Sequence, residues 1–236
     1  MKLKAILLLL SAAVAFAVPA RATTTYELLF AFTGFDYQDP NTVLGPTLDH
    51  SDYLAVGEGY KVVGFVTQFG PSLSPYVSSS NEYTNHIFNM TVATHSYFAG
   101  FFEADFSNGG RSRYYGDPIS GGTHGDYGVN PPNATSPSTF IDGSMRLGGS
   151  VDNFKLVINF NATPATGTFS GDMTLDEGPD LIYFPTNKSG WTLGGTAGQP
   201  NATIPAGYDN QVTGECKLLV TPTTHRTWGA IKALYR

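Results

Sequence analysis

The chain has 236 residues, one cysteine, and 19 acidic against 13 basic side chains. Phosphate groups are bound by cationic surfaces, so this acidity excludes nucleic acid as an expected partner and disfavours anionic lipid. A single cysteine excludes an internal disulfide, and a chain of this length buries enough apolar surface to fold without one.

The first 22 residues have the three parts of a secretory signal peptide. Lys2 and Lys4 form a basic start, an apolar run covers residues 5–18, and Ala20-Arg21-Ala22 has the small-x-small pattern that signal peptidase cleaves. The apolar run is shorter than the roughly 20 residues that span a bilayer. We therefore expect cleavage after Ala22, no transmembrane segment afterwards, and a mature protein that is secreted or held in the cell envelope.

Apolar side chains alternate with a period of two along the mature chain, which predicts β-strands with one buried face. Strands are expected at residues 26–32, 60–69, 86–94, 98–106, 139–147, 154–160, 169–175 and 211–220. The predicted core face includes Phe30, Phe102, Phe154, Ile158, Phe169 and Cys216. Many short strands with turn residues between them, and no interleaved helices, predict an antiparallel β-sandwich or jelly roll over residues 23–220.

Residues 221–236 differ from the body of the chain. Pro222 and its threonine neighbours predict a short extended linker. Apolar residues then recur at helical spacing among basic ones, at Trp228, Ile231, Leu234 and Tyr235. We expect a short basic amphipathic C-terminal helix over 227–236, which docks on its own domain or serves as a sorting tail.

Two segments carry a family resemblance. Gly34-Phe35-Asp36 follows the first strand, and Gly167–Gly171 is a strand flanked by glycines. Together with the Gly-, Asn- and Thr-rich composition, these segments resemble bacterial secreted proteins of the PEP-CTERM type. The resemblance implies an uncharacterised component of the envelope or matrix. The Pro-Glu-Pro motif, apolar helix and arginine cluster of that family's C-terminal anchor are missing from the sequence.

Common hydrolase motifs, such as Gly-x-Ser-x-Gly and His-Glu-x-x-His, are absent. Glu103 and Asp105 are the candidate catalytic pair, because both project from the face opposite Phe102 and Phe106, about 7 Å apart. Inverting glycosidases separate their carboxyl groups by about 6.5–9.5 Å. Two acids on the solvated face of a strand are the simpler interpretation, so the sequence does not favour an enzyme.

Four acidic residues form the densest such group: Asp172, Asp176, Glu177 and Asp180. Residues 176–180 have the composition of a turn, where carboxylates and carbonyls could surround a hard cation. Calcium suits flexible oxygen sites of this kind and is the one cofactor that the sequence suggests. Acidic turns without a metal are the alternative.

Aromatic residues make up 13% of the chain, and several lie in Gly- and Pro-rich segments: Tyr114, Tyr115, Tyr127, Tyr183, Trp191 and Tyr208. Such side chains either stack on sugar rings or pack down as loop anchors. Two functions are therefore open. The first is a non-catalytic envelope or extracellular protein that contacts other envelope components. The second is a carbohydrate-binding module or a glycan-active enzyme, for which exposed aromatics in a groove beside Glu103 and Asp105 would be the evidence.

Overall fold

The computed structural model describes residues 25–39, 53–119, 137–186, 188–198, 204–205 and 207–220. The strands are β1 Thr25–Asp39, β2 Gly59–Phe69, β3 Asn81–Phe98, β4 Phe101–Phe106, β5 Gly110–Pro118, β6 Ser144–Asn159, β7 Thr166–Glu177, β8 Trp191–Gly198 and β9 Asn210–Val220. The short 3-10 segments are η2 Ser74–Tyr76, η4 Pro137–Phe140 and η5 Pro179–Tyr183. Within these ranges no helix has the length and apolarity needed to cross a membrane. The predicted signal peptide and C-terminal helix lie outside the described residues.

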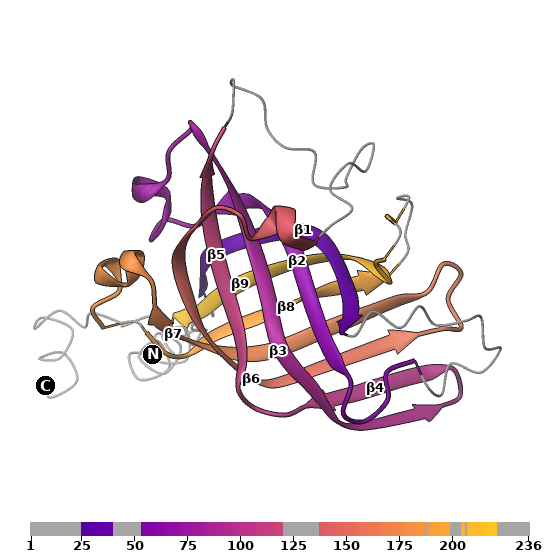
Figure 1. Ribbon diagram of the computed structural model, residues 1–236. Helices are drawn as coiled ribbons and strands as arrows, with labels where there is room; N and C mark the ends of the chain where they lie inside the picture. Colours follow the sequence, from indigo (N-terminus) through magenta and orange to yellow (C-terminus); the bar gives the residue numbers. More distant parts are fainter. Residues whose placement is uncertain are drawn as a thin grey trace, which may run out of the picture. The chain divides into compact units, whose positions relative to one another are not determined.

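Apart from β4 and β5, successive strands pair antiparallel, and β9 pairs with β1, so the sheet closes into a barrel (Figure 1). The closing seam includes a hydrogen bond from Thr33 Oγ1 to the Val212 carbonyl oxygen, 3.3 Å away. The predicted sandwich or jelly roll is therefore wrong. Both architectures bury one face of every strand and give the same alternation, whereas only the pairing of the first strand with the last makes a barrel.

Eight strands form the closed wall of the barrel, and β4 is an additional ninth strand. β5 pairs with residues 81–88 of β3 and 144–151 of β6. β4 pairs with the later halves of the same two strands, residues 92–98 and 155–159. β4 and β5 therefore follow one another between β3 and β6, with residues 107–109 between them.

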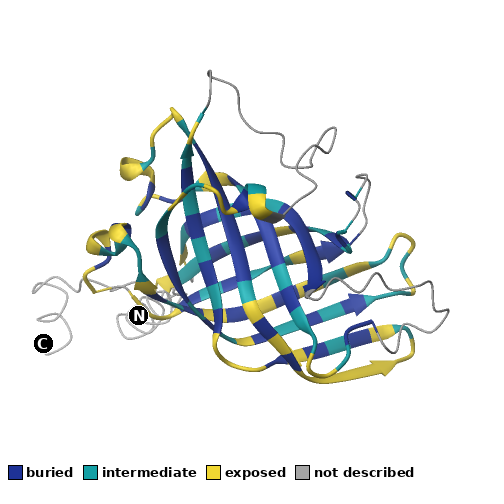
Figure 2. Cartoon of the chain, viewed as in Figure 1, coloured by how far each residue is buried: buried dark blue, intermediate teal, exposed yellow. Residues whose placement is uncertain are grey.

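Alternate residues along the strands are buried, and Figure 2 shows these residues as dark blue bands across the strands. All six residues predicted for the core face are buried, which confirms that assignment. Large rings dominate this core, including Phe30, Phe32, Tyr60, Phe102, Phe154, Phe169 and Trp191. Glycine makes room for them: a Cβ at Gly214 would lie 2.6 Å from the Phe32 ring. Burying each large apolar side chain contributes about 1.5–3 kcal/mol to stability.

A second apolar cluster contains Phe35, Tyr37, Val63, Phe140 and Tyr208. Phe35 and Tyr37 alternate with the interior residues of β1, so this cluster lies on the outer side of β1 and β2. The rings of Phe35 and Tyr208 are 5.1 Å apart. This end of β1 is therefore buried on both faces, unlike a strand whose outer face meets water.

Candidate functional site

A buried polar cluster joins β1, β2 and β9 where the barrel closes. Asp36 is fully buried and accepts hydrogen bonds from Tyr60 Oη at 2.7 Å and from the Asn210 backbone N–H at 2.7 Å. Asn210 Nδ2 also donates to both Asp36 carboxylate oxygens at 3.1 Å and to the hydroxyl of Tyr53. Gln38 Nε2 donates to the Tyr53 carbonyl oxygen at 2.7 Å. The cluster therefore ties the first strand to the second and to the last.

Burial dominates the electrostatics of this cluster. It raises the pKa of Asp36 to about 7, although the hydrogen bonds from Tyr60 and Asn210 oppose that rise. Asp209 adds repulsion, and burial raises its own pKa to about 6. Each of the polar groups described has a partner inside the cluster. This arrangement fits a structural role, which is to hold the three strands together, better than a catalytic role.

The candidate catalytic pair lies on β4, on the outer face that the sequence predicts. Lys155 of the neighbouring strand β6 bridges the two carboxylates, with Nζ 2.6 Å from Glu103 Oε1 and 3.4 Å from Asp105 Oδ1. The register explains this bridge, because Lys155 lies directly opposite Asp105. The two acids are about half exposed and share one cation. The sequence indicates their face but not the lysine, which comes from a distant segment.

The last two residues of β7, Asp176 and Glu177, are two of the candidate calcium ligands, and arginines bind both. Arg111 donates to both carboxylate oxygens of Asp176, at 2.8 and 2.6 Å. Arg113 donates to Glu177 at 2.9 and 3.1 Å, and this hydrogen bonding lowers the pKa of Glu177. Arg111 and Arg113 are two residues apart on β5, so both side chains project from its outer face, where they bind the two acids.

The other two candidate ligands point to different partners. Asp172 accepts a hydrogen bond from Asn153 Nδ2 at 2.7 Å, and the buried carboxylate of Asp180 pairs with Arg146 at 2.7 Å. Among the described residues, no three His, Cys, Asp or Glu side chains gather closely enough to hold a metal ion. Calcium at Asp172–Asp180 stays a prediction, and a bound ion would compete with these arginines.

The aromatic residues singled out from the sequence serve mostly as anchors. Trp191, Tyr114 and Tyr208 are buried, and Tyr115 is partly buried. Tyr183 is partly exposed but stacks on Tyr76, with ring centroids 3.4 Å apart. Tyr127 lies outside the described residues. Where the structure describes them, these rings therefore form no row beside Glu103 and Asp105.

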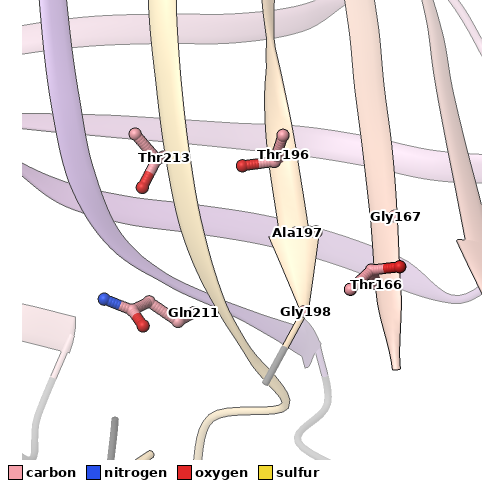
Figure 3. A pocket seen from close by; sticks show the side chains of 7 residues that line it. All are labelled: Thr166, Gly167, Thr196, Ala197, Gly198, Gln211 and Thr213. Atoms are coloured by element: carbon pink, nitrogen blue, oxygen red, sulfur yellow. The ribbon is translucent and has the colours of Figure 1, made fainter. Parts of the chain in front are cut away.

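A pocket of about 290 Å³ opens where the ends of β7, β8 and β9 lie side by side (Figure 3). It is lined by Thr166, Gly167, Thr196, Ala197, Gly198, Gln211 and Thr213. Thr168, Thr196 and Thr213 lie opposite one another across the three strands. The lining offers hydroxyl and amide groups without charge. Sequence reasoning missed this site because its residues come from three strands, and only the pairing register brings them together.

Comparison of the chain with family models, curated proteins and solved structures finds no match. No family is assigned. The resemblance to secreted proteins of the PEP-CTERM type stays a prediction from the sequence.

Proposed function

We propose that this chain is an exported, non-catalytic β-barrel that acts as a structural or interaction protein in the cell envelope or outside the cell. One observation carries the proposal: the acidic residues with the best claim to chemistry are all engaged in ion pairs or hydrogen bonds. Lys155 bridges Glu103 and Asp105, and arginines bind Asp176, Glu177 and Asp180. Such contacts hold strands together and leave none of these five acids poised for proton transfer.

The outer face supports an aqueous environment for this barrel. Membrane barrels present an apolar band about 25 Å tall, flanked by aromatic girdles. Here the outer face of β4 to β7 carries the ion pairs of Lys155, Arg111 and Arg113. The outer face of β7 to β9 carries threonines, including Thr166, Thr196 and Thr213 of the pocket. Exposing these groups to lipid would be costly, whereas water solvates them.

Expression of the full chain in a bacterial host tests export and solubility together. We expect a mature amino terminus at Thr23 by mass spectrometry, and protein that stays in solution after export without detergent. An uncleaved amino terminus would contradict export by a cleavable signal. A requirement for detergent would contradict a water-soluble barrel.

A second candidate function is carbohydrate binding, which the pocket in Figure 3 favours. Neutral hydroxyl and amide groups, such as those of Thr196 and Gln211, match the hydroxyls of an uncharged sugar. A glycan array with the wild type and Thr196→Val tests this function, because valine keeps the shape but lacks the hydroxyl. Thr91→Val, at an exposed threonine of β3, is the matched control. A signal that Thr196→Val loses and Thr91→Val keeps supports binding, and an array without any signal rejects it.

A further inference from the structure

β3 continues beyond its neighbour β2. β3 has 18 residues and β2 has 11, and their pairing ends at Gly59 opposite Thr91. Val92 still bonds the backbone of Gly57 and Glu58, at 2.9 Å each. From residue 93 to 98, β3 pairs with β4 on one side and with no described strand on the other. We call residues 93–98 the free edge; all of them are exposed, and Figure 2 shows this end of β3 in yellow.

The turn between β3 and β4 shows which backbone groups of the free edge are unused. Ala99 and Gly100 both have positive φ, 50° and 83°, as in the two-residue type I′ turn of a hairpin. Phe98 and Phe101 are partners across that turn. In a two-residue hairpin the residues that flank the turn form a hydrogen-bonded pair. Because bonded and non-bonded pairs alternate, the N–H and C=O groups of His95 and Tyr97 point away from β4.

The side chains of the free edge do nothing to block pairing. Natural edge strands are protected by charged residues, proline or bulges. The sequence from 93 to 98, Ala-Thr-His-Ser-Tyr-Phe, contains no proline, no lysine and no acid. The pairing with β4 is irregular between Val92 and Thr94, but it is regular from Thr94 to Phe98. The His95 ring contacts the Leu54 carbonyl oxygen, which leaves the backbone groups of His95 and Tyr97 unused. Phe98 at its end is 82% exposed, the largest exposure among the large apolar side chains described. Strand addition to a sheet uses unpaired backbone groups at an edge, together with side-chain contacts such as an exposed ring provides.

We propose that the free edge pairs antiparallel with the free edge of a second copy of this chain, with His95 opposite Tyr97 of the second copy. In this register each outward N–H meets a carbonyl oxygen, and Ser96 lies on the two-fold axis. Phe98 then packs beside Thr94 of the second copy, which removes the exposed ring from water.

A second copy fits this edge better than an arbitrary strand for two reasons. The edge is self-complementary under a two-fold rotation, which is the commonest symmetry of protein oligomers. The chain also carries a net charge of −6, which opposes self-association over most surfaces, whereas the free edge bears no acidic side chain. The inference is independent of the proposed function, because it rests only on the backbone and side chains of the free edge and on the charge of the chain.

Cysteine substitutions on the full-length exported protein test the register. Ser96 and its symmetry mate form a non-hydrogen-bonded pair, with Cα atoms about 4.5 Å apart, which is within the range of a disulfide. Ser96→Cys should therefore form a covalent dimer in air, seen on a non-reducing gel. Thr94→Cys is the matched control on the same strand and face, because its two copies would lie roughly 14 Å apart. Cys216 is buried and does not compete.

Proline and alanine at residue 97 test whether backbone pairing holds the dimer. Light scattering after size exclusion should give twice the monomer mass for the wild type and for Tyr97→Ala. Tyr97→Pro should be monomeric, since it removes only an N–H that points away from β4. Circular dichroism confirms its fold, and if that variant unfolds, the cysteine pair decides alone. A monomeric wild type, equal cross-linking of both cysteine variants, or a folded Tyr97→Pro that stays dimeric would each overturn the proposal.

Discussion

Replacing Asp36 by Asn should change how the stability of the barrel depends on pH. Burial raises the pKa of Asp36 from 3.8 to about 7 in the folded protein. In the unfolded chain the carboxyl is exposed and keeps its ordinary pKa. Between these two values the folded protein holds a proton that the unfolded chain has released, so the free energy of unfolding falls as the pH rises.

The magnitude follows from the size of that shift. Each pKa unit corresponds to about 1.4 kcal/mol, so Asp36 alone should lower the free energy of unfolding by about 3 kcal/mol between pH 5 and pH 8. Above pH 8 its contribution is flat, because the carboxyl is then ionised in both states. Asp209, whose pKa is raised to about 6, acts in the same direction over a lower pH range.

Urea unfolding followed by the fluorescence of the buried Trp191 measures this effect at a series of pH values. The wild type should lose stability from pH 5 to pH 8, and Asp36→Asn should lose about 3 kcal/mol less over that range. Asp172→Asn, at an exposed acid, is the control and should follow the wild type. Parallel curves for wild type and Asp36→Asn would refute the reasoning and show that the hydrogen bonds from Tyr60 and Asn210 keep Asp36 ionised.

Three further predictions concern the arginine–carboxylate pairs, the cysteine and the candidate calcium site. Arg146→Met should lower the free energy of unfolding at pH 7 by about 2–3 kcal/mol, because it leaves the buried carboxylate of Asp180 without its cation. Arg111→Met, at a more exposed pair, should cost about 1 kcal/mol in the same urea assay, and equal losses would contradict this ranking. Burial raises the pKa of the Cys216 thiol, so Ellman's reagent should react with it only after denaturation; rapid labelling of native protein would show the assigned face to be wrong. Millimolar calcium should raise the Tm if the acids at 172–180 bind it, and an unchanged Tm would remove that hypothesis.

Local features of this fold could be predicted from the sequence, whereas closure could not. Period-two alternation places Phe30, Phe154 and Phe169 on buried faces, and the structure confirms all three. The same alternation arises in a sandwich and in a barrel. The choice depends on the pairing of β1 with β9, whose residues are far apart in the sequence. That pairing has no local signature, so the sandwich was the wrong choice.

The partners of the charged residues could not be predicted either, because they also come from segments far apart in the sequence. Alternation puts Glu103 and Asp105 on the outer face of β4, but their partner Lys155 lies on β6 and is placed by register. The sequence does not indicate that Asp36 is buried, because an acid after Gly34-Phe35 is typical of a turn. The structure instead extends β1 to Asp39 and directs Asp36 inward, to the hydroxyl of Tyr60.

Barrel closure and the free edge have one structural cause. A closed sheet pairs every strand on both sides and so removes its edges. Closure removes all edges only where neighbouring strands have matching lengths. Here β3 continues past the residue that pairs with Gly59, the first residue of β2. The chain after β3 turns back as β4, which pairs with this extension on one side and reaches β6 on the other. The additional strand therefore completes the wall toward β6, and on the opposite side residues 93–98 have no partner strand in the described part of the chain. The extra strand and the proposed dimer contact therefore follow from the same mismatch in strand length. Extending β2 to cover the edge should abolish association without disturbing the barrel.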